Sequence, residues 1–177
     1  MSRFLTGRVP GVRDEVDRLV EAWRRERPDL DLGPMEVLSR VSRVSRQLDV
    51  ARRAAFAEHG IEQWEFDVLA ALRRAGPPYQ LSPGRLLRET LVTSGTMTNR
   101  VDRLAGRGLV ERLPDPRDRR SVLVRLTAAG RETVDGALAS LLELERPLLG
   151  ALGAEDQERL AGLLRRLAAS VGSSDSG

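Results

Sequence analysis

A chain of 177 residues is long enough for one compact domain with helical extensions. Its 41% hydrophobic and 31% charged residues are typical of a soluble globular protein, and no apolar run reaches the ~20 residues of a membrane-spanning helix. The lack of cysteine excludes disulfides, thiol catalysis and cysteine-ligated zinc, and the N-terminus lacks the apolar stretch of a secretory signal, so we expect a cytoplasmic protein.

The positive charge is concentrated in one part of the chain. All 29 basic residues are arginine, yet the formal net charge is only +3. Residues 82–125 hold 10 arginines against 5 acidic residues, whereas the remaining residues have a slight negative balance. This distribution predicts a surface that binds a polyanion.

Helical spacing of apolar residues dominates the first part of the chain. It predicts a short amphipathic helix over 12–27, which Pro28 stops, and a long helix over 35–59. A third helix, over 61–75, is apolar on most sides and is therefore expected at the centre of the core. The Gly-Pro-Pro of residues 76–78 breaks the chain after it.

Two short helices are predicted next. Ser82, followed by a proline, is a favourable start for a helix that reaches about Thr90, because serine caps a helix and proline gives up no needed donor there. Thr93 caps a second helix, which ends at Gly106 or Gly108. Two short helices joined by a tight turn have helix-turn-helix geometry.

The period then changes to that of strands. Residues 109–113 and 121–126 are predicted strands on either side of a charged, turn-rich tip. A helix-turn-helix followed by such a hairpin is a winged helix. Thr127 caps a predicted helix through Leu149, and 154–171 forms another.

The expected fold is therefore mainly α with a small β-hairpin wing. We expect N-terminal helices within 1–60, a winged helix-turn-helix over 61–126, C-terminal helices over 127–171 and a disordered tail over 172–177.

The second helix of the motif is predicted to contact DNA. Met97, Val101 and Leu104 fall on one buried stripe, which leaves hydroxyl, amide and guanidinium groups facing outward. These groups suit base edges and phosphates, and the arginine-rich tip can reach into a minor groove. The alternatives are a solvated helix face and a surface ion-pair turn. The candidate DNA contacts are Ser82, Ser94, Thr96, Thr98, Asn99, Arg103, Arg117, Arg119 and Arg120.

A buried charge pair is also predicted. Asp67 interrupts the apolar run of the third helix, and Arg100 lies on the buried stripe of the recognition helix. Because an unpaired buried charge is costly, we expect the two side chains to face each other. The pair is either a structural salt bridge or part of an anion-dependent switch. Trp64 is interpreted as a core residue, and His59 as a residue that helps to end the helix before it.

An enzyme is not predicted. One histidine without cysteine forms neither a catalytic triad nor a standard zinc site, and no phosphate-binding glycine motif occurs. We therefore expect no cofactor and no metal. A winged-helix module that binds a protein instead of DNA is an alternative that the basic segment disfavours, and salt-dependent DNA binding would distinguish the two.

The run from Leu81 to Thr127, with TSGTMTNRVDRLAGRGLVER, DPRDRR and VRLTAAG, resembles the MarR family of bacterial regulators. The resemblance implies a homodimer with interleaved N- and C-terminal helices, bound to double-stranded DNA at a pseudo-palindromic operator with recognition helices about 10 bp apart. It also implies a repressor that a small anionic or phenolic ligand releases. A constitutive regulator without ligand control is the alternative.

The chain is also similar to the urate-responsive branch of this family, whose extra N-terminal helix carries a tryptophan. That resemblance implies urate or a related purine as ligand, with a polycarboxylate such as citrate second. A bound anion would compete for the two arginines and displace the recognition helix, while the tryptophan would stack on the ligand or simply pack in the core. The implied ligand residues are Trp23, Asp67, Arg100 and Arg112.

Overall fold

The computed structural model describes residues 13–90, 94–116 and 118–172, without the side chains of Ser94, residues 118–121 and Val171. The chain forms two compact units, Met1–Val50 and Ala51–Gly177.

The first unit contains α1 (Glu15–Glu26) and the beginning of α2 (Gly33–Glu58). Asp14 caps α1: its carboxylate accepts hydrogen bonds from the backbone N–H groups of Val16 and Asp17. A small apolar cluster forms under the helix from two of its valines, Leu32 and the adjacent Met35. The helix predicted over 12–27 is confirmed as α1, which is shorter: it begins at Glu15, after the cap, and ends at Glu26.

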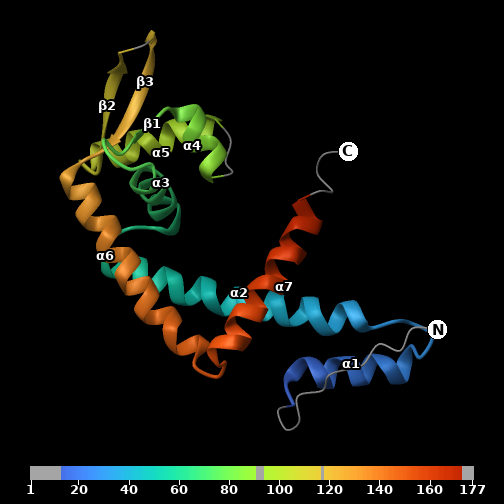
Figure 1. Ribbon diagram of the computed structural model, residues 1–177. Helices are drawn as coiled ribbons and strands as arrows, with labels where there is room; N and C mark the ends of the chain where they lie inside the picture. Colours follow the sequence, from blue (N-terminus) through green and yellow to red (C-terminus); the bar gives the residue numbers. More distant parts are fainter. Residues whose placement is uncertain (1–12, 91–93, 117, 173–177) are drawn as a thin grey trace. The chain divides into compact units, whose positions relative to one another are not determined.

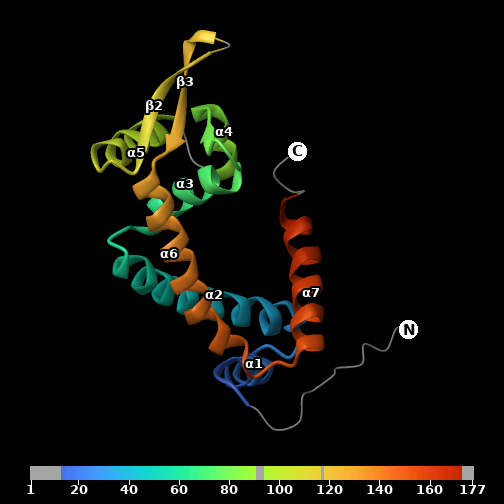
Figure 2. The same cartoon turned by 60° about the vertical axis from the view of Figure 1, so that its left-hand side comes forward.

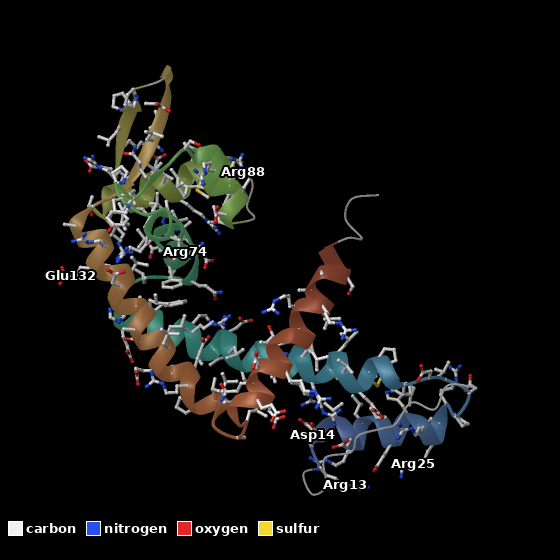
Figure 3. The ribbon with its side chains drawn as sticks, viewed as in Figure 1. Arg13, Asp14, Arg25, Arg74, Arg88 and Glu132 are labelled. Carbon is white, nitrogen blue, oxygen red and sulfur yellow. The ribbon has the colours of Figure 1, made fainter. Side chains whose placement is uncertain are left out.

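Ion pairs join α1 to α2. The Arg40 guanidinium donates to Asp14 at 2.8 and 3.0 Å and to Asp17 at 2.8 Å. These hydrogen bonds are the largest reason that the pKa of Asp14, at the start of α1 in Figure 3, falls to about 2. Arg43 also pairs with Glu15. The packing of α1 therefore depends on charge as well as on its apolar cluster.

The second unit has a helical body and a small sheet (Figures 1 and 2). Its elements are the end of α2, α3 (Gln63–Arg74), β1 (Gln80–Leu81), α4 (Pro83–Thr90), α5 (Ser94–Gly106), β2 (Val110–Asp115), β3 (Asp118–Leu126), α6 (Ala128–Glu145), η1 (Arg146–Leu149) and α7 (Ala154–Gly172).

The sheet is antiparallel in the order β1-β3-β2. Strands β2 and β3 form the predicted hairpin, which projects away from α3, α4 and α5 in both views (Figures 1 and 2). The short β1 was not predicted, because two residues are too few to show a period. It pairs with β3 through Gln80 opposite Arg125 and Leu81 opposite Val124, so it ties the base of the wing to the helices.

The core of this unit is built around α3. Its Val68, Leu69 and Leu72 are completely buried, which confirms the expected central position of this helix. Met97 and Leu104 of α5 are buried too, as the predicted stripe requires. The fold is thus a winged helix-turn-helix whose recognition helix lies with one face against α3.

The start of α6 is held by a close backbone approach. Thr127 accepts a hydrogen bond from the Gly130 N–H at 3.0 Å, as a helix cap, and its hydroxyl also contacts the carbonyl oxygens of Gly108 and Leu109. A Cβ on Gly130 would lie 2.0 Å from the Leu109 carbonyl oxygen. This contact explains the glycine of the RLTAAG sequence.

The C-terminal helices differ from the prediction in two details. The helix α7 includes Gly172, the first residue of the predicted tail over 172–177, and the other residues of that tail lie outside the described ones. The helix expected from Thr127 through Leu149 ends at Glu145, and a short 3₁₀ turn follows. Pro147 is the reason, because proline lacks the N–H that would continue an α-helix. Within the described residues, no helix combines the length and the apolar content that crossing a membrane requires.

Candidate nucleic-acid interface

The helix-turn-helix of α4 and α5 exposes the face that the sequence predicted. Opposite the buried stripe of α5, the side chains of Thr96, Thr98, Asn99 and Arg103 are exposed. Hydroxyl, amide and guanidinium groups therefore share one side of the helix, next to the wing. Their orientation agrees with the prediction, and their role as DNA contacts remains a prediction.

Some of the predicted contacts fall where the structure gives no side-chain information. Arg117 lies outside the described residues, and Ser94, Arg119 and Arg120 are described only by their backbone, in α5 and β3. Ser82 precedes α4, and its hydroxyl accepts a long hydrogen bond of 3.4 Å from the Arg85 N–H, as expected for a cap.

Two further arginines lie on α4, and the sequence analysis did not single them out. Arg85 and Arg88 are exposed on the side of α4 opposite the buried Leu86 (Arg88 is labelled in Figure 3). Among the described residues, neither forms an ion pair. The first helix of a helix-turn-helix crosses the DNA backbone, so these charges are candidate phosphate contacts. The sequence signal that could have found them is their spacing of three residues, which places both arginines on one side of a helix.

The buried charge pair is present, but between other residues than predicted. Glu65 of α3 is only 2% exposed, and both of its carboxylate oxygens accept from one nitrogen of Arg107, at 2.6 and 2.7 Å. Arg107 also donates to the Gly60 carbonyl oxygen at 2.8 Å. Because Arg107 directly follows α5, this pair fixes the end of the recognition helix to the start of α3.

Asp67, which we expected to be buried, is exposed, and it forms no ion pair with Arg100 among the described residues. Two residues along a helix turn the side chain by about 200°, so Asp67 cannot share the buried face of Glu65. Partial burial still raises the pKa of its carboxyl, and the charges of Arg100, Arg74 and Arg52 lower it by less. Asp67 is therefore a partly desolvated carboxylate near arginines.

Asp67 lies on the wall of a cleft of about 550 Å³ in the second unit. Cationic, anionic, amide, apolar and indole groups all contribute to this wall, so the cleft can make both polar and stacking contacts with an occupant. Its lining residues are Arg53, Ala57, Ile61, Glu62, Gln63, Trp64 and Asp67.

Trp64, which we expected to be a core residue, also makes polar contacts. It packs against the core and remains partly exposed, and its Nε1–H donates to Glu62 at 2.9 Å. The guanidinium carbons of Arg103 and Arg100 lie 4.7 and 5.3 Å from its ring centroid. Arg100 is therefore only partly buried and faces this indole, because the start of α3 covers that side of α5.

The other predicted ligand residues lie apart from the core. Arg112 of β2 pairs with Asp102 of α5 at 2.7 Å, which links the wing to the recognition helix. Trp23 belongs to the first unit, where it is 45% exposed instead of packed in the core.

His59 lies where the prediction placed it, directly after the last residue of α2: its backbone N–H donates to the Phe56 carbonyl oxygen at 3.1 Å, and Gly60 follows with a φ of 64°. The prediction did not include the side-chain contact: its Nε2 lies 2.8 Å from the Ser140 hydroxyl, in the space that Gly136 leaves open, so the ring contacts α6. The described residues contain no cluster of histidine and acidic side chains that could hold a metal ion.

Comparison with known proteins agrees with this geometry. A model of the MarR family matches residues 59–121, from the end of α2 to β3. The transcriptional regulator PecS of Dickeya dadantii is 39% identical over 153 residues, which are 86% of this chain and 92% of PecS.

Two solved structures extend the comparison. A mutant of Escherichia coli MarR complexed with operator DNA superposes with a TM-score of 0.66 at 30% identity, over 78% of this chain and 99% of that chain. BpsR of Bordetella bronchiseptica, whose DNA binding is regulated by 6-hydroxynicotinic acid, has a TM-score of 0.65 at 25% identity, over 77% and 95%. The chain belongs to the MarR family of DNA-binding transcriptional regulators, which are not enzymes.

Proposed function

We propose that the protein is a homodimeric repressor that binds a pseudo-palindromic operator and leaves it when a small anionic ligand binds. The observation that carries the proposal is the exposed polar face of α5 beside the wing. The related MarR of known structure was solved on operator DNA, which supports the same use of this face. Repression follows if a protein bound over a promoter blocks the polymerase.

A second copy of the chain accounts for the apolar surface of the C-terminal helices. Leu160, Leu163 and Leu164 form an exposed stripe on α7, and no side chain from 154 to 170 is buried within the described chain. Leu138 and Leu142 are exposed on α6. Burying a leucine contributes about 1.5–3 kcal/mol, so covering these stripes in a dimer is strongly favourable.

The dimer is tested by sedimentation equilibrium. The wild-type chain is expected at twice its monomer mass. The double substitution Leu160→Glu and Leu164→Glu places charges on the stripe and should give a monomer that no longer binds an operator. A variant that stays dimeric would remove α7 from the interface.

The ligand part of the proposal rests on the cleft beside Asp67. The partly desolvated carboxylate of Asp67 lies there with the Trp64 indole and the Arg53 guanidinium. These groups offer a stacking surface, a positive charge and a hydrogen-bond acceptor, which suit a planar anion with hydrogen-bonding edges. The regulation of the related BpsR by 6-hydroxynicotinic acid supports control by such a compound. We propose urate or a related purine first and a polycarboxylate such as citrate second, with Asp67 on the cleft wall and Arg100 and Arg112 of the same unit as ligand residues. Trp23, which the resemblance also implies, belongs to the other unit, and its role stays a prediction.

Gel-shift titration of the DNA upstream of the protein's own gene, with urate and then citrate at fixed salt, tests this proposal. If urate releases the wild-type protein from the DNA and releases the Arg112→Gln variant less, the result would support the ligand residues. Tight binding that neither compound changes would leave a constitutive regulator. Binding without sequence preference or salt dependence would favour a protein-interaction module instead.

A further inference from the structure

Two side chains at the start of α3 hold the recognition helix from outside the core. Glu62 directly precedes α3, and one of its carboxylate oxygens accepts from the Trp64 indole N–H at 2.9 Å. Its other oxygen accepts from Arg103 at 3.1 Å. The carboxylate thus fixes the indole and pairs with α5 at the same time.

The indole completes the contact. Arg103 and Arg100 are about one helical turn apart on α5, and their guanidinium carbons lie 4.7 and 5.3 Å from the Trp64 ring centroid. Tryptophan is the most favourable aromatic partner for such cation–π contacts, and arginine is the cation most often found in them. Two successive turns of α5 are therefore held by one aromatic ring, beside the buried stripe of the helix.

We infer that Trp64 and Glu62 act as a clamp that positions the recognition helix for operator recognition, with Arg100 and Arg103 as its counterparts on α5. The hydrophobic stripe buries one face of α5, and its apolar contacts are not directional. The clamp supplies directional contacts. This inference rests on the proposed operator binding, and it makes Trp64 and Glu62 positioning residues that do not touch DNA.

The clamp also borders the cleft, since Glu62 and Trp64 belong to both. Any occupant of the cleft therefore meets the side chains that hold α5. Glu65 and Arg107 fix the end of the helix and Arg112 pairs with Asp102, while the clamp holds the side chains of Arg100 and Arg103.

Operator discrimination tests the clamp. The dissociation constants for the operator and for a scrambled duplex of equal length are measured at several salt concentrations. Trp64→Leu should lower the preference for the operator, which is the dissociation constant for the scrambled duplex divided by that for the operator, about tenfold. This loss corresponds to two cation–π contacts and to one ion pair that the indole no longer holds in place. Binding to the scrambled duplex and its salt slope should stay as in the wild type, because phosphate contacts are unchanged. A general loss of stability would weaken both duplexes alike.

Further variants separate the clamp from a folding defect. Trp64→Phe keeps an aromatic face and should retain most of the discrimination, while Glu62→Gln, at an exposed position, should lose part of it. Glu143→Gln is the matched control, because it breaks an exposed pair with Arg146 of similar length and should change nothing. Wild-type discrimination in both Trp64→Leu and Glu62→Gln would overturn the clamp. A wild-type protein that does not prefer any operator would overturn the proposed function and the clamp with it.

Discussion

The pair of Glu65 and Arg107 makes a quantitative prediction about stability. Arg107→Met removes both hydrogen bonds from the guanidinium to the carboxylate and leaves Glu65 with one, from the Glu62 N–H. Breaking a buried pair in this way costs about 3–5 kcal/mol. Because the Arg107 side chain is 42% exposed, water can partly replace it, and we expect the lower end, about 3 kcal/mol.

Urea unfolding monitored by circular dichroism measures this loss. The double variant Glu65→Met with Arg107→Met should recover most of the free energy of unfolding, since removing both charges leaves no unpaired carboxylate in the core. Arg146→Met, which breaks only an exposed pair, should cost less than about 1 kcal/mol. The reasoning is refuted if Arg107→Met costs no more than this control, or if the double variant is less stable than Arg107→Met.

Three other predictions concern single groups. Burial raises the pKa of Asp67, so its charge opposes folding as pH rises. Asp67→Asn should therefore increase the free energy of unfolding in urea by less than about 1 kcal/mol at pH 7 and leave it unchanged at pH 3. A decrease at pH 7 would contradict this reasoning. Because the pKa of Asp14 is lowered from 3.8 to about 2, its pairing with Arg40 stabilises α1 above pH 4 and is lost toward pH 2. The helical circular dichroism signal should fall over that range, and Asp14→Asn should abolish this fall. An unchanged fall in the variant would show that another group causes it. Gly130→Ala places a Cβ against the Leu109 carbonyl oxygen and should cost about 3 kcal/mol or more in urea unfolding, whereas an unaffected midpoint would show that α6 shifts freely.

The elements with a clear period were predictable from the sequence. The stripe of Met97, Val101 and Leu104 predicted both the burial and the outward face of α5, because three apolar residues at helical spacing define an orientation. The turn-rich segment between two alternating runs likewise predicted the wing. The two-residue β1 gave no such signal, and its existence depends on pairing with β3, a contact distant in sequence.

The charged contacts were harder to predict than the helices that carry them. Asp67 stood out because it interrupts an apolar run, yet Glu65 is the buried carboxylate. A helical projection around Val68 and Leu72 would have distinguished them, since Glu65 lies on their face. Its partner Arg107 lies in an irregular segment after α5, where periodicity says nothing about direction.

The clamp could not be inferred from the sequence for a similar reason. Trp64 lies near the edge of an apolar face, where an indole can be either core or surface. Its contacts with Arg100 and Arg103 come from packing α3 against α5, and the spacing within either helix does not reveal them.

The central claim is that the exposed face of α5 and the wing bind DNA in a sequence-specific manner. Fluorescence anisotropy with the duplex upstream of the protein's own gene, and a scrambled duplex as competitor, tests it most directly across a range of salt. The account predicts a preference for the upstream duplex, an affinity that falls steeply with salt, and a weaker affinity in Asn99→Ala. Equal binding to both duplexes with no dependence on salt would contradict it.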